Sequence, residues 1–298
     1  MTHTRADLHE LLEAHGLHPS RALGQNFVGD ANTVRRIVRL AGVGPSSRVV
    51  EIGAGLGSLT LALAEAGAEV TAVEIDRHVV PVLRSQVEPV GVRVVEADAL
   101  TVDWEELLGR PGGSTAGEAL AGADPPERTG ADRWTLVANL PYNVAVPLVI
   151  RVLEEAPGIG SALVMVQREV GERLAAGAGD EAYGAVSVKV AYWARASVVG
   201  RVPASVFVPR PKVESVLVRL DRHPTRGAGT SAADIPYDRL FAVVRAGFAH
   251  RRKMLRRSLD GLVPAGAFEV AGIEPTARPE ELGLGQWGDL VAAAFPVR

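Results

Sequence analysis

The chain has 298 residues, of which 47% are hydrophobic and 22% are charged, a composition typical of a soluble globular protein. No apolar run approaches the roughly 18–20 residues that a membrane helix needs, and the acidic, helical N-terminus lacks the pattern of a secretory signal. The chain contains no cysteine, which excludes disulfides and thiolate metal sites. We therefore expect a cytoplasmic protein without a metal centre.

The net charge of −3 conceals an asymmetry along the chain. Residues 199–298 carry 15 Lys/Arg and 10 Asp/Glu, whereas residues 1–198 carry 17 Lys/Arg and 25 Asp/Glu. This polarity is compatible with a basic surface that binds an anionic partner. Chance clustering of charge on a solvated surface explains it equally well.

Short β-branched segments alternate with helical patterns from about residue 48 to residue 218, which predicts a doubly wound α/β sheet. The early apolar runs lack strict alternation, as expected for strands covered by helices on both faces. The predicted strands are Arg48–Ile52, Glu69–Glu74, Val92–Glu96, Thr135–Ala138, Ala162–Gln167, Ala194–Val202 and Val213–Leu220, and the helices between them include Ser58–Ala66, Arg77–Val87 and Val146–Glu155. The last two strands are close in sequence and suggest an antiparallel edge pair.

Two changes of composition divide the chain. Gly109–Ala131 is dominated by Gly, Ala, Pro and Ser, and we predict a flexible surface insertion there. After Arg222 a loop or linker leads to helical patterns at Tyr237–Phe248 and Arg251–Leu259 and near the C-terminus. We predict a catalytic domain over residues 1–207, and an edge strand followed by a small helical domain over residues 208–298.

A glycine-rich turn, Glu51–Gly57, follows the first predicted strand. Gly53 and Gly55 let the backbone pass close to a ligand, because neither has a Cβ. The G-x-G-x-G pattern alone is weak evidence, since dehydrogenases and other nucleotide-binding proteins share it. A tight turn without any ligand would also produce it.

Two acidic residues at the ends of the next two strands narrow the ligand class. Glu74 lies 21 positions after Gly53, where a carboxylate can accept from both hydroxyls of a ribose. Asp98 follows the third strand, where its carboxylate can accept from an adenine amino group. Each acid could instead cap a helix. Both together, at the strand ends where open α/β sheets bind ligands, favour a ligand that contains adenosine.

The fourth strand leads into Asn139-Leu140-Pro141-Tyr142. An exocyclic aromatic amine is a poor nucleophile, and acceptors for its two N–H groups draw the nitrogen toward tetrahedral geometry. The Asn139 side-chain oxygen and the Leu140 carbonyl can be those acceptors. Pro141 stiffens the turn and has no N–H, and Tyr142 offers a flat face for stacking a base. The pattern favours amine methylation, against the alternative of a strand that ends at a proline beside a buried tyrosine.

These motifs resemble the KsgA family of ribosomal RNA adenine dimethyltransferases, over nearly the whole chain apart from the insertion. The likeness is carried by Leu23–Phe27, Glu51–Gly57, Asn139–Tyr142 with its continuation to Leu148, and Phe207–Ser215. The resemblance implies a Rossmann-like S-adenosylmethionine-dependent methyltransferase sheet with a small C-terminal helical domain. It further implies that two methyl groups go to N6 of each of two adjacent adenines in a hairpin near the 3′ end of small-subunit RNA, and that the protein acts in small-subunit assembly.

The resemblance also implies roles for single residues. The cofactor S-adenosylmethionine would contact Asn26, the backbone of Val28, Gly53, Gly55, Glu74, Asp98 and Asn139. The catalytic set would be Asn139, Leu140, Pro141, Tyr142 and Phe207, with Phe207 stacking on the second face of the target adenine. The expected partner is small-subunit ribosomal RNA in the assembling subunit, bound by a monomer without a membrane attachment.

A basic cluster in the second domain is the expected RNA contact. Arg252 and Arg256 share a face of the predicted helix Arg251–Leu259, and the expected RNA-binding residues are Arg245, Arg251, Arg252, Lys253, Arg256 and Arg257. A solvated helix face is the alternative. Two departures from the family pattern are the Val at position 28, where leucine is commoner, and the acids of the loop Gly179–Ala185, which argue against a phosphate contact from that loop.

Three other functions remain open at this stage. A large-subunit RNA adenine methyltransferase of the macrolide-resistance type shares the fold and the tetrad, although the A-Y-G loop and the P-K-V-E-S segment favour the small-subunit enzyme. A non-catalytic assembly factor would need neither the tetrad nor Glu74 and Asp98. A DNA amine methyltransferase fits less well, because its tetrad usually continues with Pro-Pro.

Overall fold

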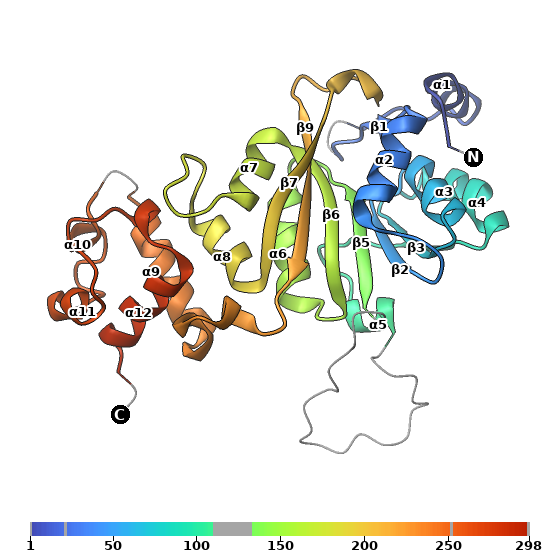
Figure 1. Cartoon of the computed structure of the whole chain (residues 1–298). Coiled ribbons are helices and arrows are strands. Elements are labelled where there is room, and N and C mark those ends of the chain that lie inside the picture. Colours follow the sequence, from blue (N-terminus) through green and yellow to red (C-terminus); the bar gives the residue numbers. More distant parts are fainter. Residues whose placement is uncertain (1, 21–22, 110–132, 251–252, 297–298) are drawn as a thin grey trace, which may run out of the picture. The chain divides into compact units, whose positions relative to one another are not determined.

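The computed structural model describes residues 2–20, 23–109, 133–250 and 253–296, and the chain forms two compact units (Figure 1). Unit 1 comprises Met1–Arg168 and Val199–Arg219, and unit 2 comprises Glu169–Val198 and Leu220–Arg298. Neither unit is continuous in sequence, because the chain leaves unit 1 at residue 168 and returns to it for residues 199–219. The predicted division into residues 1–207 and 208–298 stays a prediction.

Unit 1 begins with three short elements that precede the main sheet. Helix α1 is Arg5–Ala14, strand β1 is Phe27–Val28, and helix α2 is Ala31–Ala41. The α1 helix starts with a capping box, in which the Thr4 side chain accepts from the Asp7 N–H and the Asp7 carboxylate accepts from the Thr4 N–H. Asp30 caps α2 in a similar way, accepting from the Thr33 N–H at 2.6 Å.

A seven-stranded sheet follows, with the order β4-β3-β2-β5-β6-β9-β7. Its strands are β2 (Arg48–Ile52), β3 (Glu69–Glu74), β4 (Arg93–Glu96), β5 (Trp134–Asn139), β6 (Ile159–Gln167), β7 (Ala194–Val202) and β9 (Ser215–Arg222). The pairs β3/β4, β2/β3, β2/β5 and β5/β6 are parallel. A separate two-stranded antiparallel sheet joins β1 to β8 (Phe207–Val208).

The strand order reverses direction between β2 and β5. The chain runs outward through β2, β3 and β4, then returns to the other side of β2 as β5 and continues to β6. Such a switch point leaves a crevice at the carboxyl ends of the two central strands, where open α/β sheets bind their ligands. The glycine-rich turn follows β2 and the Asn139 tetrad follows β5, so the topology brings the two motifs to one edge.

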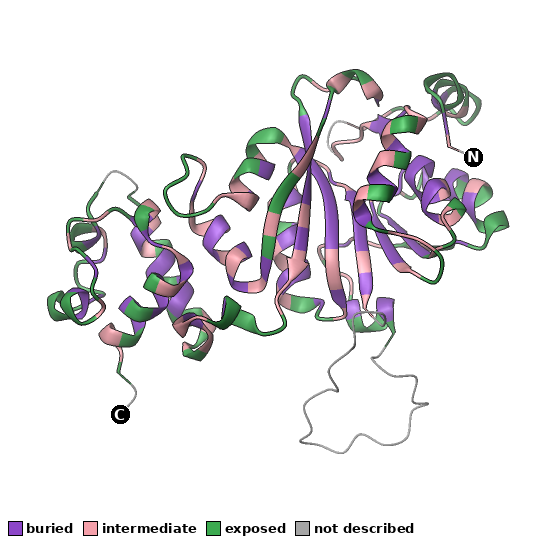
Figure 2. Cartoon of the chain, viewed as in Figure 1, coloured by how far each residue is buried: buried purple, intermediate pink, exposed green. Residues whose placement is uncertain are grey.

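Helices connect the parallel strands of unit 1. They are α3 (Ser58–Glu65), α4 (Val80–Val87), the 3₁₀ turn η1 (Glu88–Val90), α5 (Trp104–Leu108) and α6 (Ala145–Glu155). The main core packs α2 and α3 against the central strands, with Val34, Leu63, Val49 and Val137 all fully buried. Figure 2 shows that the central strands are buried over most of their length. This explains why their sequences do not alternate strictly.

The structure confirms the predicted doubly wound sheet. The predicted bounds of β2, β3 and β7 agree with the structure to the residue, and β9 and β7 are neighbours at one side of the sheet. Strand β4 at the opposite side is only partly buried, as its place at the end of the strand order explains. Helix α4 begins at Val80 rather than Arg77, because Asp76 accepts from the N–H of His78 and of Val80 and forms a turn first.

Unit 2 is mostly helical. Its elements are α7 (Arg168–Ala175), α8 (Ala185–Trp193), the 3₁₀ turns η4 (Arg226–Gly229) and η5 (Ser231–Asp234), α9 (Tyr237–Phe248), α10 (Leu255–Ser258), α11 (Ala265–Val270), η6 (Pro279–Glu281) and α12 (Leu284–Ala294). The 3₁₀ turn η3 (Ala204–Val206), in contrast, belongs to unit 1. The core of unit 2 includes Tyr192, Phe241, Phe268 and Trp287, each at most 2% exposed.

The predicted helix Arg251–Leu259 is wrong in its extent. The helix that the structure describes, α10, contains only Leu255–Ser258, and Met254 before it is extended with φ −62° and ψ 149°. The N–H groups of Leu255 and Arg256 donate to the carbonyls of Ala277 and Pro275, so the acceptors lie in another segment of unit 2. Arg251 and Arg252 lie outside the described residues, as does the predicted insertion apart from Gly109.

Among the described residues, every helix is too short or too polar to cross a lipid bilayer.

Candidate active site

A cavity in unit 1 opens at the switch point between β2 and β5. It is lined by the turn after β2, the ends of β3 and β4, the loop before β1, and the tetrad after β5. The predicted residues that line it are Asn26, Gly53, Gly55, Glu74, Asp98, Asn139, Leu140, Pro141 and Tyr142. The structure therefore brings together most of the predicted cofactor residues and the whole tetrad.

The glycine-rich turn requires its glycines. Gly53, Gly55 and Gly57 all have positive φ, at 72°, 57° and 87°. A Cβ on Gly55 would lie 2.8 Å from the Phe27 ring, and a Cβ on Gly57 would lie 2.9 Å from Val87. A Cβ on Gly53 would meet nothing closer than the Asn139 carbonyl at 3.6 Å, and Gly53 and Gly55 both line the cavity.

Glu74 holds this turn in place. Its Oε2 accepts from the Gly55 N–H at 2.8 Å, and its Oε1 accepts from the N–H groups of Ile75 and Asp76 at 2.9 Å. Burial raises the pKa of Glu74, and these three backbone donors oppose that shift. A carboxylate has about four acceptor positions. One position on Oε2 remains for a ligand hydroxyl.

Asp98 and Ile75 shape the far end of the cavity. One Asp98 oxygen, Oδ1, accepts from the Leu100 N–H at 2.8 Å, which folds the chain into a turn after β4. Asp98 also lines the cavity, and its role as an acceptor from an adenine amino group stays a prediction. Ile75 is 48% exposed beside Glu74 and gives the cavity an apolar surface. The sequence offered no signal for Ile75 beyond its place after the acidic residue.

Asn139 is oriented by a hydrogen bond to the loop before β1. Its Nδ2 donates to the Asn26 carbonyl at 2.8 Å. A carbonyl can only accept, so the amide nitrogen must face Asn26, and the side-chain oxygen is left as the acceptor in the cavity. Asn26 therefore acts on Asn139 through its backbone, in addition to lining the cavity itself.

The rest of the tetrad is held by neighbouring strands. The Leu140 N–H donates to the Met165 carbonyl of β6 at 3.0 Å, which holds the backbone at the start of the tetrad against β6. The Tyr142 hydroxyl is 3.1 Å from Ser215 Oγ, and Ser215 is fully buried at the start of β9. Sequence reasoning noted Ser215 only as the end of a motif. The structure shows that it holds the tyrosine ring.

Two predicted residues do not face the cavity. Phe207 is 1% exposed and packs in the main core of unit 1 with residues such as Ala54 and Met165. Val28 is 5% exposed in the same core and pairs with Phe207 across the β1/β8 ladder. The Phe207 ring therefore lies in the core in this structure, and its role as a stacking wall stays a prediction. A stacking role would require β8 to move.

The loop before β1 contributes residues that the sequence had not assigned. Gln25 Nε2 donates to Asp76 Oδ2 at 2.7 Å, which joins the loop to the end of β3. Gly24 has φ 62°, and a Cβ there would lie 2.9 Å from the Pro141 side chain. The loop can cover the tetrad because position 24 is a glycine.

The buried carboxyl of Glu51 lies behind the turn rather than in the cavity. It is 2% exposed on β2, and burial raises its pKa to about 8, with Glu74 adding to that shift and Thr60 opposing it. Glu51 is therefore mostly protonated at neutral pH. A neutral carboxyl beside Glu74 avoids placing two negative charges behind the turn.

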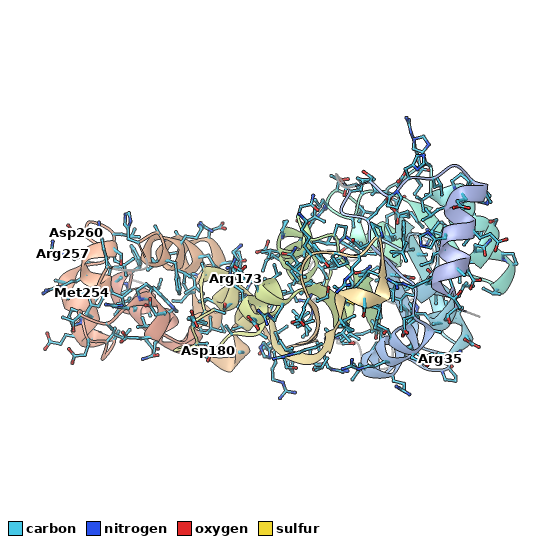
Figure 3. The ribbon with its side chains drawn as sticks, turned by 90° about the horizontal axis from the view of Figure 1, so that it is seen from above. Arg35, Arg173, Asp180, Met254, Arg257 and Asp260 are labelled. Carbon is cyan, nitrogen blue, oxygen red and sulfur yellow. The ribbon has the colours of Figure 1, made fainter. Side chains whose placement is uncertain are left out.

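The described residues of the predicted RNA-binding set lie on the surface of unit 2. Arg245, Lys253, Arg256 and Arg257 are all exposed. Met254 is 41% exposed between them. Figure 3 shows Met254 and Arg257 at one end of this unit. The RNA contact stays a prediction, with Arg245 on α9, Lys253 before α10, and Arg256 and Arg257 in the single turn of α10 rather than on a long helix.

Comparison with known proteins points to one family. The sequence profile of the ribosomal RNA adenine dimethylase family matches residues 18–294. A ribosomal RNA small subunit methyltransferase A from Leifsonia xyli is 45% identical over 96% of each chain. One from Cutibacterium acnes is 42% identical over 97% of this chain and 93% of its own length.

Two solved structures share the fold. The 23S rRNA methyltransferase ErmE superposes with a TM-score of 0.64 at 26% identity, covering 90% of this chain and 99% of its own. A dimethyladenosine transferase from Plasmodium falciparum gives a TM-score of 0.68 at 22% identity, covering 89% and 95%. The second likeness supports the fold alone.

The contact between Tyr142 and Ser215 can be tested by a double-mutant cycle. We expect Ser215→Ala and Tyr142→Phe each to slow methyl transfer about 3- to 10-fold, the effect of losing one hydrogen bond of about 1 kcal/mol. The double variant should be no slower than either single variant, because both remove the same bond. Ser187→Ala is the matched control, since Ser187 is a buried serine of α8 in unit 2. Additive effects would contradict the contact.

Glu51 predicts a pH dependence of stability. Its pKa is about 8 in the folded protein and near its ordinary value of 4.5 in the unfolded chain, so the folded state binds more protons between these values. The contribution of Glu51 to stability is then present below about pH 4.5 and is lost as the pH rises toward 8. We expect Glu51→Gln to raise the thermal unfolding midpoint more at pH 8 than at pH 5. An equal shift at both pH values would show that Glu51 does not titrate in this way.

Proposed function

The chain belongs to the ribosomal RNA adenine dimethylase family, and we propose that it transfers methyl groups from S-adenosylmethionine to N6 of two adjacent adenines in the 3′-terminal hairpin of small-subunit ribosomal RNA. The observation that carries the proposal is the oriented Asn139 amide, whose nitrogen is bonded to the Asn26 carbonyl, so that its oxygen is left to accept in a cavity that Leu140 also lines. The product would be N6,N6-dimethyladenosine. A role in small-subunit assembly follows the same proposal.

The residues of the cavity fit the methyl donor. Glu74 has one acceptor position left for a ribose hydroxyl, Asp98 has a free oxygen at the adenine end, and Ile75 supplies an apolar surface for the adenine ring. Gly53 allows the chain to approach the remainder of the donor without a side chain in the way. S-adenosylmethionine supplies an electrophilic methyl group on a sulfonium, so the protein has mainly to position the two reactants.

The tetrad acts on the target nitrogen through hydrogen-bond acceptors. The Asn139 oxygen and the Leu140 carbonyl can each accept one N–H of the adenine amine, which localises its lone pair and stabilises the positive charge that develops. Neither group needs to remove a proton before transfer. The bond from Asn139 to Asn26 orients the first acceptor before the substrate arrives, and the bond from the Leu140 N–H to Met165 holds the backbone of the tetrad against β6. Pre-organised acceptors of this kind cost little reorganisation during the reaction.

Tyr142 is the aromatic residue of the tetrad, and it lines the cavity. Its hydroxyl is held by Ser215, so the ring presents a fixed face. A base taken out of its helix can stack on such a face at a gain of about 1–3 kcal/mol. The second wall remains a proposal for Phe207, which would have to leave the core on binding.

The RNA contact is proposed for the basic surface of unit 2. Arg245, Lys253, Arg256 and Arg257 are exposed and can neutralise phosphates. Arg251 and Arg252 belong to the proposed set by sequence. RNA helices are recognised largely by shape and backbone, which a basic surface serves well. A cytoplasmic monomer that acts on the assembling subunit is the setting that we infer.

A large-subunit RNA adenine methyltransferase is the alternative with a specific observation behind it, because ErmE, named as a 23S rRNA methyltransferase, shares the fold over nearly its whole length. The curated relatives at 42–45% identity are named for the small subunit, and they favour the first assignment.

Labelled S-adenosylmethionine and immature ribosomal subunits test the substrate directly. We expect label in dimethyladenosine from small-subunit RNA after nuclease digestion and nucleoside analysis. Label confined to large-subunit RNA would support the alternative. Tight binding to subunits without any label would contradict an enzymatic role.

Asn139→Ala tests the proposed chemistry. Loss of one pre-organised acceptor should slow transfer by about 100-fold or more. Binding of S-adenosylhomocysteine, measured by calorimetry, should weaken but stay measurable, since Glu74 and Asp98 are unchanged. A variant with wild-type activity would overturn the proposed role of the tetrad.

A further inference from the structure

The N-terminal segment of residues 3–14 is the part of unit 1 that the catalytic assignment leaves unexplained. It lies outside the family profile, which begins at residue 18. The segment nevertheless contacts both halves of the site. Its helix α1 buries Leu8 and Leu12 in an apolar cluster that also contains Leu56 of the glycine-rich turn and Val208 of β8. The helix is thus packed between the cofactor turn and the strand that contains Phe207.

His3 provides a polar contact with the cofactor turn. It is 8% exposed, and its Nδ1 is 3.2 Å from Ser58 Oγ, which is itself 7% exposed. Ser58 is the first residue of α3 and directly follows Gly57. Burial lowers the pKa of His3, so the ring is uncharged at neutral pH. This buried pair fixes the end of the turn from which Gly53 and Gly55 face the cavity.

Arg5 provides the corresponding contact with β8. Its Nη2 donates to the Phe207 carbonyl at 3.2 Å. The first turn of α1 can come this close because residue 29 is a glycine. A Cβ there would lie 2.9 Å from Arg5 Cγ and 3.1 Å from Leu8 Cδ1. The Gly29 N–H in turn donates to the Val206 carbonyl, directly before β8.

The β1/β8 ladder completes the connection. Phe27 pairs with Val208 and Val28 with Phe207, while the Phe27 ring rests against Gly55 of the cofactor turn. Asn26, one residue before β1, accepts from Asn139. A shift of β1 or β8 would therefore move the acceptor that orients Asn139. Misplacement of reacting groups by about 1 Å can cost a factor of about 100 in rate.

We propose that His3 and Arg5 are positioning residues, which hold the cofactor turn and the β1/β8 ladder in the relation that methyl transfer needs. The inference rests on the proposed methyl transfer, and it assigns the two contacts different effects. His3 acts on the turn and so on cofactor binding. Arg5 acts on β8 and, through β1 and Asn26, on the transfer step.

The test uses the full-length protein and immature small ribosomal subunits. Arg5→Met keeps the aliphatic stem over Gly29 and removes the donor. We expect it to lower the single-turnover rate about tenfold while the Kd of S-adenosylhomocysteine changes less than about threefold, since one charged hydrogen bond is lost away from the cofactor. Arg5→Lys, which retains a donor, should recover most of the rate.

His3→Leu should show the opposite pattern, with a larger effect on cofactor binding than on the transfer rate. Loss of the contact with Ser58 should weaken S-adenosylhomocysteine binding about 3- to 10-fold, with a smaller effect on the single-turnover rate at saturating cofactor. Gly29→Ala should lower the rate as Arg5→Met does, because it displaces α1 without removing the guanidinium.

Arg36→Met is the matched control. Arg36 on α2 also donates to a backbone carbonyl across unit 1, that of Arg201 at 2.9 Å, but it does not line the cavity. The Arg36→Met variant should leave both the single-turnover rate and the Kd of S-adenosylhomocysteine unchanged. The inference is overturned if Arg5→Met transfers at the wild-type rate, if Arg5→Lys is as slow as Arg5→Met, or if Arg36→Met slows transfer equally. A wild-type protein that leaves small-subunit RNA unmethylated would instead overturn the proposed function.

Discussion

The hydrogen bond from the Asn139 amide to the Asn26 carbonyl is the interaction on which the rest of the site depends. It joins the loop before β1 to the end of β5, and it turns the amide nitrogen of Asn139 toward Asn26, which leaves the amide oxygen as the acceptor. The same loop is fixed by Gln25 to the end of β3 and by Gly24 against Pro141. In the function that we propose, the acceptor for the target amine is therefore set by the fold before either reactant binds, as catalysis by pre-organised polar groups requires.

A second part of the cavity, around Glu74, is also held by a small number of polar groups. Glu74 uses three of its acceptor positions to hold the backbone of the turn and of the segment after β3. In the proposed function Glu74 also binds the ribose of the cofactor, and this double role explains why an acid is needed there even though it is buried. Glu51 behind it stays protonated, so the charge of Glu74 is not opposed by a second carboxylate.

The sequence predicted the sheet and the tetrad because their signals are local. Glycines with positive φ follow β2, acids follow β3 and β4, and proline follows β5, so each marks a strand end by its own chemistry. The features that the sequence did not predict depend on distant residues. Phe207 is turned into the core by pairing with β1, and α10 is shortened by bonds to residues 275 and 277. The contact of Tyr142 with Ser215 joins residues 73 positions apart, so no local sequence pattern predicts it.

In the mechanism that we propose, Asn139 acts as an oriented neutral acceptor and not as a base. Replacing it with aspartate tests this claim most directly, because Asn139→Asp keeps the shape and adds basicity but removes the N–H that donates to Asn26. Repulsion between the carboxylate and the Asn26 carbonyl should then turn the side chain from its position. The account predicts a single-turnover rate at least about tenfold below wild type on small-subunit RNA, with S-adenosylhomocysteine still bound. An aspartate variant that transfers methyl groups as fast as wild type would contradict it.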